Sequence, residues 1–246
     1  LLACNRYPDA MAEWSWALDD SSPAVRVQAA RLAFQWGWYA QSIATLASAG
    51  VWDDIRLRYP RPFEPQVDNA AERLHLPADW IYAVMRQESL FRVDAVSRAD
   101  ARGLMQLLPL TAQGVAQRWQ LPINAGALFD PSTAITLGAA HLKELLDRFQ
   151  NQLALALAAY NAGSAPLPRW LPSSSMPADI WIENIPYDET RGYVQHILEH
   201  IVAYAFTRDA TPPQLATLLP PVGPVSVYAA LPAASAASAA AAPAVN

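Results

Sequence analysis

Residues 77–88 of this 246-residue chain have the sequence PADWIYAVMRQE and form the helix on which the fold assignment depends. Apolar side chains recur in it with the period of an α-helix, and the same face ends on a carboxylate: Ile81, Val84, Met85 and Glu88. We therefore expect Glu88 to be buried near the helix C-terminus, where desolvation and the helix dipole both raise the pKa of a carboxyl group. A general acid needs such a raised pKa near neutral pH. Taken alone, this helix is also compatible with a Glu88 that merely turns to solvent at the helix end.

The helical period continues through most of the chain. From about Val67 to Arg208 strand-like alternation is scarce, and Pro, Gly and Asn mark the breaks, which predicts an all-α globular domain. The first 60 residues predict short helices at 9–18, 23–37 and 40–50, with Ser22 as the N-cap of the second. Paired short helices of this kind are typical of an α-solenoid, so we expect these to be the last helices of a superhelical region.

Prolines predict where the domains meet. The stretch 59–65, YPRPFEP, holds three prolines, which fix an extended backbone and exclude a continuous helix. We therefore expect the end of a superhelical domain at residues 1–62 and a helical domain at residues 67–208. After Asp209 no charged residue occurs, and Ala, Ser and Pro dominate, so residues 209–246 are predicted to be a flexible tail with no packing role.

Composition excludes several classes of protein. With 53% apolar and 16% charged residues the chain can bury a sizeable core, which excludes global disorder. The net charge of -5 is spread over many segments without a basic stripe, so we expect no nucleic-acid partner. A single cysteine, Cys4, allows neither an intrachain disulfide nor a thiolate metal cluster. No segment reaches the roughly 20 apolar residues of a transmembrane helix.

The first residues, Leu1 to Cys4, superficially resemble a lipoprotein cleavage box. No basic region or apolar run precedes them, and Leu1 is not an initiator methionine. We therefore expect the chain to begin inside a helix of a longer precursor, with Cys4 as a small packed residue.

Several short motifs follow one another in a fixed order. They are ESLF at 88–91, Ser97, GLMQLLP at 103–109, AYNAG at 159–163 and IENIPYDETRGYV at 182–194. Each is weak alone, but the ordered set resembles the soluble lytic transglycosylases, whose pattern ExIPxxETRxYV the last segment matches. The resemblance covers roughly residues 70–207, and the N-terminal helices are similar to the end of the superhelical region in the large members of that family.

The resemblance implies a lysozyme-like α fold with a deep cleft and a carbon–oxygen lyase that acts on the glycan strands of peptidoglycan. Glu88 would protonate the glycosidic oxygen between N-acetylmuramic acid and N-acetylglucosamine. The same group would then take the proton of the C6 hydroxyl, which closes on C1 and leaves a 1,6-anhydro end. Since the 2-acetamido carbonyl of the substrate can stabilise the cationic centre, one enzymic carboxylate suffices. No metal and no organic cofactor is expected.

The resemblance also implies roles for residues around Glu88. Six positions match residues that bind or position the substrate, namely Ser97, Met105, Gln106, Tyr160, Asn161 and Glu183. The Ser97 hydroxyl is expected near the catalytic carboxyl, Met105 and Gln106 along the sugar subsites, the Tyr160 hydroxyl beside Glu88, and Glu183 on the opposite wall.

The chain departs from the family pattern at a few positions. Asp100 stands where a glycine is usual, Ala134 where an asparagine is usual, and His141 where a tyrosine is common, while 165–170 is a variant segment. These departures put loop geometry and subsite preference in doubt more than the chemistry.

The family works on an extracytoplasmic polymer. The resemblance therefore implies a periplasmic, exported protein whose signal peptide is not part of these residues. We also expect a monomer.

The sequence HILEH at 196–200 satisfies a zinc-binding pattern with two histidines one helical turn apart. A third acidic ligand far downstream is missing, because no Asp or Glu follows Asp209. The helix predicted at 188–208 already has an apolar core face, so we expect His196 and His200 to be partly exposed, without a metal. The residues of that face are Tyr193, Val194, Ile197, Leu198, Ile201 and Ala205.

Two other functions stay open. A muramidase that admits water would need a second carboxylate within roughly 5–9.5 Å of Glu88, and Asp94 is only six residues away in the sequence. A glycan-binding protein without turnover would have kept the cleft alone, but the retention of Glu88, Ser97, Gln106 and Tyr160 argues against it.

Overall fold

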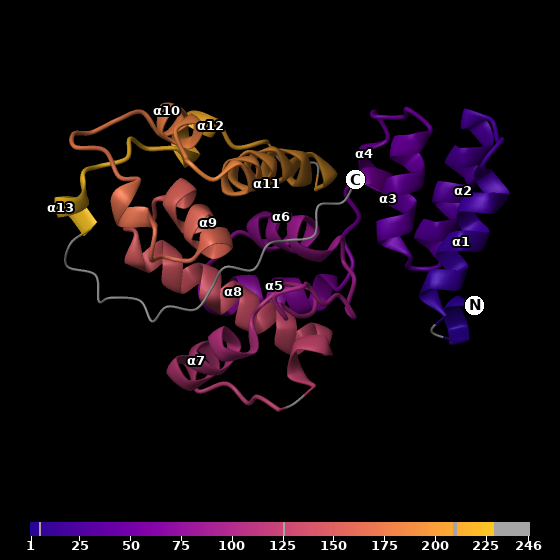
Figure 1. Ribbon diagram of the computed structural model, residues 1–246, viewed down its shortest axis with the longest axis horizontal. Helices are drawn as coiled ribbons and strands as arrows, with labels where there is room; N and C mark the ends of the chain where they lie inside the picture. Colours follow the sequence, from indigo (N-terminus) through magenta and orange to yellow (C-terminus); the bar gives the residue numbers. More distant parts are fainter. Residues whose placement is uncertain (5, 125, 209–210, 229–246) are drawn as a thin grey trace. The chain divides into compact units, whose positions relative to one another are not determined.

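A computed structural model describes residues 1–4, 6–124, 126–208 and 211–228. The chain forms two compact units, Leu1–Pro62 and Phe63–Asn246 (Figure 1). The residues that the structure describes contain no β-strand, and the expectation of an all-α protein is confirmed. None of the described helices is both long enough and apolar enough to cross a membrane.

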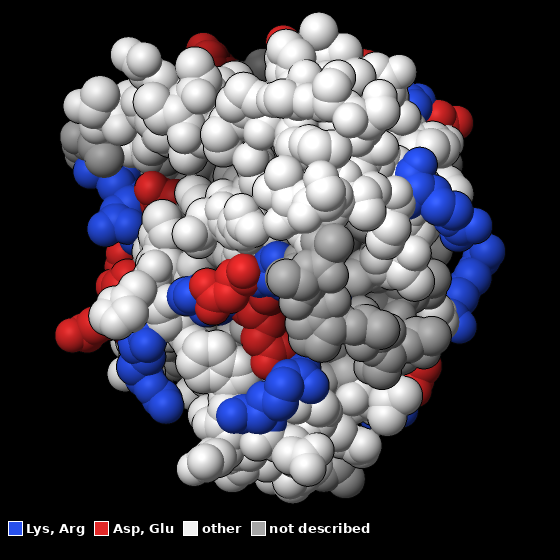
Figure 2. Space-filling view, turned by 90° about the vertical axis from the view of Figure 1, so that its left-hand side faces the viewer, with Lys and Arg blue, Asp and Glu red and all other residues white. Residues whose placement is uncertain are grey.

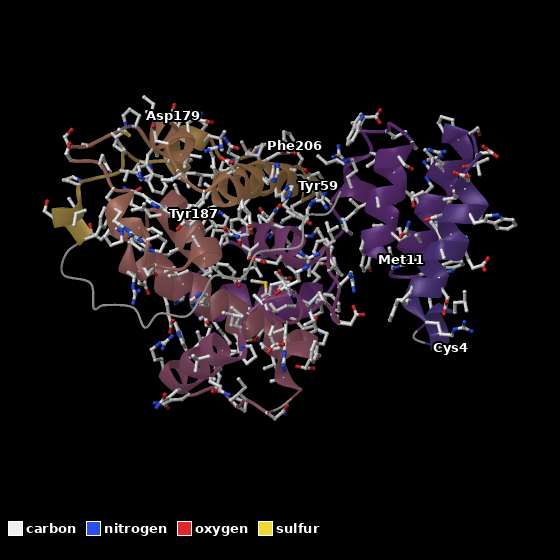
Figure 3. The ribbon with its side chains drawn as sticks, in the orientation of Figure 1. Cys4, Met11, Tyr59, Asp179, Tyr187 and Phe206 are labelled. Carbon is white, nitrogen blue, oxygen red and sulfur yellow. The ribbon has the colours of Figure 1, made fainter. Side chains whose placement is uncertain are left out.

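The first unit consists of short helices. They are η1 (Leu2–Cys4), α1 (Tyr7–Leu18), α2 (Pro23–Gln35), α3 (Tyr39–Ser48) and α4 (Ile55–Arg58). The three longer ones are the helices predicted above, with ends shifted by one or two residues, and the Ser22 hydroxyl caps α2 by accepting from the Val25 amide at 3.4 Å. Trp14 packs edge-on against Trp38, with ring centroids 5.5 Å apart. Cys4, labelled in Figure 3, is exposed and not a packed residue as expected.

The second unit contains the remaining elements. They are α5 (Glu64–Leu74), α6 (Ala78–Ser89), α7 (Pro109–Trp119), η2 (Ala127–Phe129), α8 (Pro131–Arg148), α9 (Leu153–Ala162), η3 (Leu167–Arg169), α10 (Ala178–Glu183), α11 (Asp188–Thr207), α12 (Leu215–Leu218) and α13 (Val225–Tyr228).

Helix α9 lies at the centre of this unit. Residues 153–161 are all buried, as expected for a helix whose surface is apolar all round. It packs against α8 on one side and α11 on another, and α11 also packs against α6. The stacked rings of Tyr82 and Tyr204, 5.3 Å apart, lie at the α6–α11 contact. This arrangement brings the ends of α6, α9 and α11 together, although they are far apart in the sequence.

The segment after α11 corrects one prediction. Residues 211–228 do pack, since Val222 is fully buried and pairs with Met176 through two backbone hydrogen bonds of 2.8 and 2.9 Å. The Gln152 amide donates to the Pro221 carbonyl at 2.9 Å, and Tyr228 packs against Phe149. The expectation of no packing role is therefore wrong for these residues, because the apolar side chains in a segment without charges find a surface on the helical domain. The expectation for residues 229–246 lies outside the described residues.

Figure 2 shows one face of the molecule, on which acidic and basic side chains lie in small groups among neutral atoms. Among the coloured atoms of that face the basic side chains form no continuous surface.

Candidate active site

Glu88 lies in the last turn of α6, and its side chain is buried, with only 7% of the residue exposed. The helix ends because Leu90 and Phe91 both adopt left-handed backbone angles, with φ of 48° and 67°. The Ser89 hydroxyl donates to the Leu104 carbonyl at 2.9 Å and ties the helix end to the following loop. The expectation that Glu88 belongs to the buried face of this helix is confirmed.

The hydroxyl of Tyr193, from α11, donates to Glu88 Oε1 at 2.6 Å. The pKa of Glu88 is raised from 4.5 to about 8 as the net result of three effects: burial raises it most, the hydrogen bond from Tyr193 lowers it, and the negative charge of Glu189 raises it. The carboxyl group is therefore mostly protonated at neutral pH. Desolvation raises the pKa of Glu88 as expected, whereas the effect of the Glu189 charge on this pKa is not among the expectations from the sequence.

Tyr160 stands on α9 with its ring buried. Its hydroxyl donates to the carbonyl of Met105 at 2.9 Å, so it fixes the GLMQ loop. Burial raises the pKa of Tyr160 well above its usual value, and the negative charge of Glu88 raises it further, which keeps the phenol protonated.

Asn161, the next residue on α9, connects that helix to the start of α11. Its side-chain oxygen accepts from the Thr190 hydroxyl at 2.7 Å, and its side-chain nitrogen donates to Glu189 at 3.4 Å. The pairing orients the Asn161 amide and holds the Glu189 carboxylate beside the site.

The loop between α6 and α7 is held by its own polar side chains. The Ser97 hydroxyl oxygen accepts from the amides of Ala99 and Ala101, at 3.2 and 3.0 Å. The Gln106 amide nitrogen donates to the carbonyls of Ala95 and Gly103, at 3.1 and 2.9 Å. These contacts explain how Ser97 and Gln106 give the loop a fixed shape.

Glycine is required where this loop meets the turn η2. Gly103 has a φ of 70°, and a Cβ added there would lie 1.7 Å from the Leu128 carbonyl oxygen. The close approach is therefore to the protein's own backbone.

A small recess next to Glu88 collects most of the predicted residues. Its walls are formed by Glu88, Gln106, Leu107, Leu108, Thr111, His141, Tyr160 and Asn161. Glu88 is the one carboxylate among these residues, which come from α6, α7, α8, α9 and the loop between α6 and α7. The geometry therefore brings together four residues that the sequence analysis singled out.

Three other predicted residues lie elsewhere. Ser97 is buried within its turn and does not line the recess. The Met105 side chain is also buried and faces Gly138, where the loop approaches α8 closely. Glu183 is exposed at the end of α10 and accepts from Gln195 at 2.8 Å.

Tyr193 has no expected chemical role, but it lies on the predicted core face of α11 and is buried. The available signal is its hydroxyl, because a buried hydroxyl needs a hydrogen-bond partner, although Tyr204 is a second buried tyrosine on the same helix. The matching partner is Glu88, which stands on the buried face of α6.

A pair of aromatic rings joins the segment before α10 to the start of α11. Trp170 and Tyr187 meet edge to face with centroids 4.9 Å apart, and Tyr187, labelled in Figure 3, immediately precedes α11. The Trp181 indole donates to the Trp170 carbonyl at 2.9 Å and holds the Trp170 backbone in place.

Other candidate groups do not join the site. His196 is exposed and His200 half-buried, with ring centroids 6.4 Å apart. Across the described residues, no group of three or more His, Cys, Asp or Glu side chains could hold a metal ion. Asp94 is exposed and pairs with Arg92 at 3.5 Å.

Comparisons with known proteins agree along the chain. Residues 66–180 match the Transglycosylase SLT domain, and residues 1–55 match the Soluble lytic murein transglycosylase L domain. The putative soluble lytic murein transglycosylase of Haemophilus influenzae is 34% identical over 209 residues, which are 84% of this chain and 35% of that protein. The chain thus spans about a third of the length of the curated relatives it matches.

Solved structures give the same result. The lytic transglycosylase Slt from Pseudomonas aeruginosa, an inactive mutant with glutamine in place of a glutamate, has a TM-score of 0.80 and 35% identity, over 86% of this chain and 35% of that chain. The 70 kDa soluble lytic transglycosylase of Escherichia coli has a TM-score of 0.80 and 29% identity, over 89% of this chain and 36% of that chain.

Proposed function

The chain belongs to the soluble lytic murein transglycosylases, and on that premise we propose that it cleaves the β-1,4 bond between N-acetylmuramic acid and N-acetylglucosamine in peptidoglycan, leaving 1,6-anhydromuramyl ends. The observation that carries this proposal is the state of Glu88. It is the one carboxyl group among the residues that line the recess, and at a pKa of about 8 it holds a proton at neutral pH.

In the first step Glu88 acts as the general acid. Its proton passes to the glycosidic oxygen, the bond between that oxygen and C1 of the muramyl residue breaks, and positive charge develops at C1. The acetamido carbonyl of the substrate stabilises that charge. Glu88 becomes a carboxylate, which the Tyr193 hydroxyl stabilises through its 2.6 Å hydrogen bond.

In the second step the same carboxylate acts as the base. A buried carboxylate with a raised pKa takes up a proton readily, so it removes the proton of the C6 hydroxyl while that oxygen forms a bond to C1. The acid is regenerated and no water is consumed. One carboxylate therefore completes the cycle.

The surrounding residues hold the substrate and the catalytic group. We assign the binding of the glycan to Gln106, Tyr160 and Asn161, whose side chains line the recess. Met105 contributes its backbone carbonyl, which orients Tyr160. We assign to Ser97 the shaping of the loop between α6 and α7, and to Glu183 a contact with the glycan strand further from Glu88.

The substrate also suggests where the protein works. Peptidoglycan lies outside the cytoplasm, so we place this protein in the periplasm or outside the cell. We further propose that it acts as a monomer, which its molar mass in solution tests. The inactive glutamate-to-glutamine mutant of the Pseudomonas aeruginosa relative supports an essential glutamate in this family.

The experiment that tests the proposal measures the clearing of purified sacculi, together with the masses of the released fragments. The wild type is expected to clear the suspension and release fragments lighter by one water than hydrolysis products, and Glu88→Gln to release none. Asp94→Asn is the matched control, because its carboxylate is exposed and paired with Arg92, so it should behave as the wild type. If the wild-type protein sediments with sacculi but releases no fragments, it is a glycan-binding protein and not an enzyme.

A further inference from the structure

His141 is a recess-lining residue to which the proposed mechanism assigns no role. It stands on α8 with 13% of its side chain exposed, and its ring lies 5.1 Å from the ring of Tyr160. The imidazole therefore forms part of the wall that faces the substrate beside Glu88.

One turn further along α8, Glu144 anchors a group of polar side chains behind this wall. Its carboxylate accepts from Arg118 Nε and Nη2, both at 2.7 Å, and from the Trp119 indole at 3.0 Å. Burial alone raises the pKa of Glu144, but His141 and Arg118 lower it to about 2. Glu144 is thus a fixed negative charge whose position is set from α7.

This charge determines how the imidazole of His141 carries its proton. Nδ1 lies 3.9 Å from Glu144 Oε2 and is buried without a hydrogen-bond partner. A lone pair on Nδ1 would face the carboxylate unfavourably, whereas an N–H there points its positive end at the carboxylate. Because the two ring nitrogens of a neutral imidazole are one donor and one acceptor, Nε2 is then left as an acceptor.

His141 lines the recess, and of its two ring nitrogens only Nδ1 is buried without a hydrogen-bond partner, so we infer that Nε2 faces the recess. A neutral acceptor at the wall of a sugar site complements a hydroxyl or an amide N–H.

We propose that His141 binds the glycan directly, with Nε2 accepting a hydrogen bond from a sugar hydroxyl or acetamido N–H, and that Glu144 is the positioning residue that selects this tautomer. The inference rests on the proposed function, because it concerns the same recess. It adds a substrate contact at a recess-lining residue to which the proposed mechanism assigns no role.

The first test reads the tautomer without any activity. In the protein labelled with ¹⁵N at histidine, the ring-nitrogen chemical shifts of His141 at a pH where the imidazole is neutral are expected to show protonated Nδ1 and unprotonated Nε2. In Glu144→Gln the population of the other tautomer is expected to rise. A wild-type His141 protonated at Nε2 would overturn the proposal.

The second test measures binding of soluble, uncrosslinked peptidoglycan strands to Glu88→Gln, which cannot turn them over. Adding His141→Phe keeps a ring against Tyr160 but removes both nitrogens, and the affinity is expected to fall about tenfold. His196→Phe is the matched control, because that histidine is exposed on α11. An unchanged thermal unfolding temperature of the His141→Phe variant shows that the affinity falls because a substrate contact is lost and not because the fold is damaged.

The outcomes separate this inference from the proposed function. Equal affinity with and without His141→Phe, while the wild type still releases anhydro ends, refutes the role of His141 alone. Absence of both binding to Glu88→Gln and product from the wild type refutes the proposed function and this inference with it.

Discussion

The buried, protonated state of Glu88 predicts an unusual dependence of stability on pH. In the unfolded chain the carboxyl group ionises above its ordinary pKa of 4.5, but in the folded protein it keeps its proton up to about pH 8. Between these values the folded state binds more protons than the unfolded state, so the free energy of unfolding falls as the pH rises. Below pH 4.5 Glu88 is protonated in both the folded and the unfolded state, so it causes no loss of stability there.

The magnitude follows from the size of the window. From pH 4.5 to pH 7 is 2.5 units, which at about 1.36 kcal/mol per unit makes a loss of about 3 kcal/mol, and the full shift of 3.5 units makes about 5 kcal/mol above pH 8. Glu88→Gln removes the titration while its side-chain oxygen can still accept from Tyr193. The variant should therefore gain stability over the wild type as the pH rises.

Urea unfolding of both proteins from pH 4.5 to pH 9, followed by tryptophan fluorescence, measures this difference. Because all other titrating groups are shared, the change in the difference between the two proteins reports Glu88 alone. Parallel stability curves for the two proteins across this pH range would refute a buried, protonated Glu88.

Other substitutions test the surroundings of the site. Since activity needs protonated Glu88, kcat/KM should fall as the pH rises through about 8. Tyr193→Phe removes a hydrogen bond that lowers the pKa of Glu88, so this limb of the pH profile should move to higher pH, with activity about tenfold lower. Glu189→Gln removes a nearby negative charge, so the limb should move to lower pH, and a shift in the same direction as Tyr193→Phe would contradict the assignment. Gly103→Ala drives a methyl group into a backbone carbonyl and should cost about 3 kcal/mol or more in thermal unfolding, whereas Gly192→Ala, with open space around it in α11, should stabilise by up to about 1 kcal/mol. Equal unfolding temperatures for these two alanine variants would argue against the close contact.

The helices could be predicted because their signals are local. The spacing of Ile81, Val84 and Met85 places Glu88 on the buried face of α6, and Ser22 marks the start of α2 through its hydroxyl. The helix alone is also compatible with a Glu88 that turns to solvent, so its burial and the size of its pKa shift depend on the elements that pack against α6.

Contacts between distant elements could not be predicted in this way. Tyr193 is 105 residues from Glu88, and because Tyr204 is also a buried tyrosine of α11, the pattern of the helix does not show which hydroxyl meets Glu88. Val222 is buried against residues that are distant in the sequence. The absence of charged residues in its own segment therefore could not predict that it packs. Ser97 lies at the expected place in the chain, but its hydroxyl is used by two backbone amides.

In the proposed mechanism Glu88 serves as both acid and base, and no water molecule attacks C1. Digestion of purified sacculi in ¹⁸O-labelled water, followed by mass spectrometry of the muramyl ends, tests this directly. We expect 1,6-anhydro ends that are lighter by one water and carry no ¹⁸O, and their loss in Glu88→Gln. Reducing muramyl ends that contain ¹⁸O would contradict it, because they would show that water attacks C1.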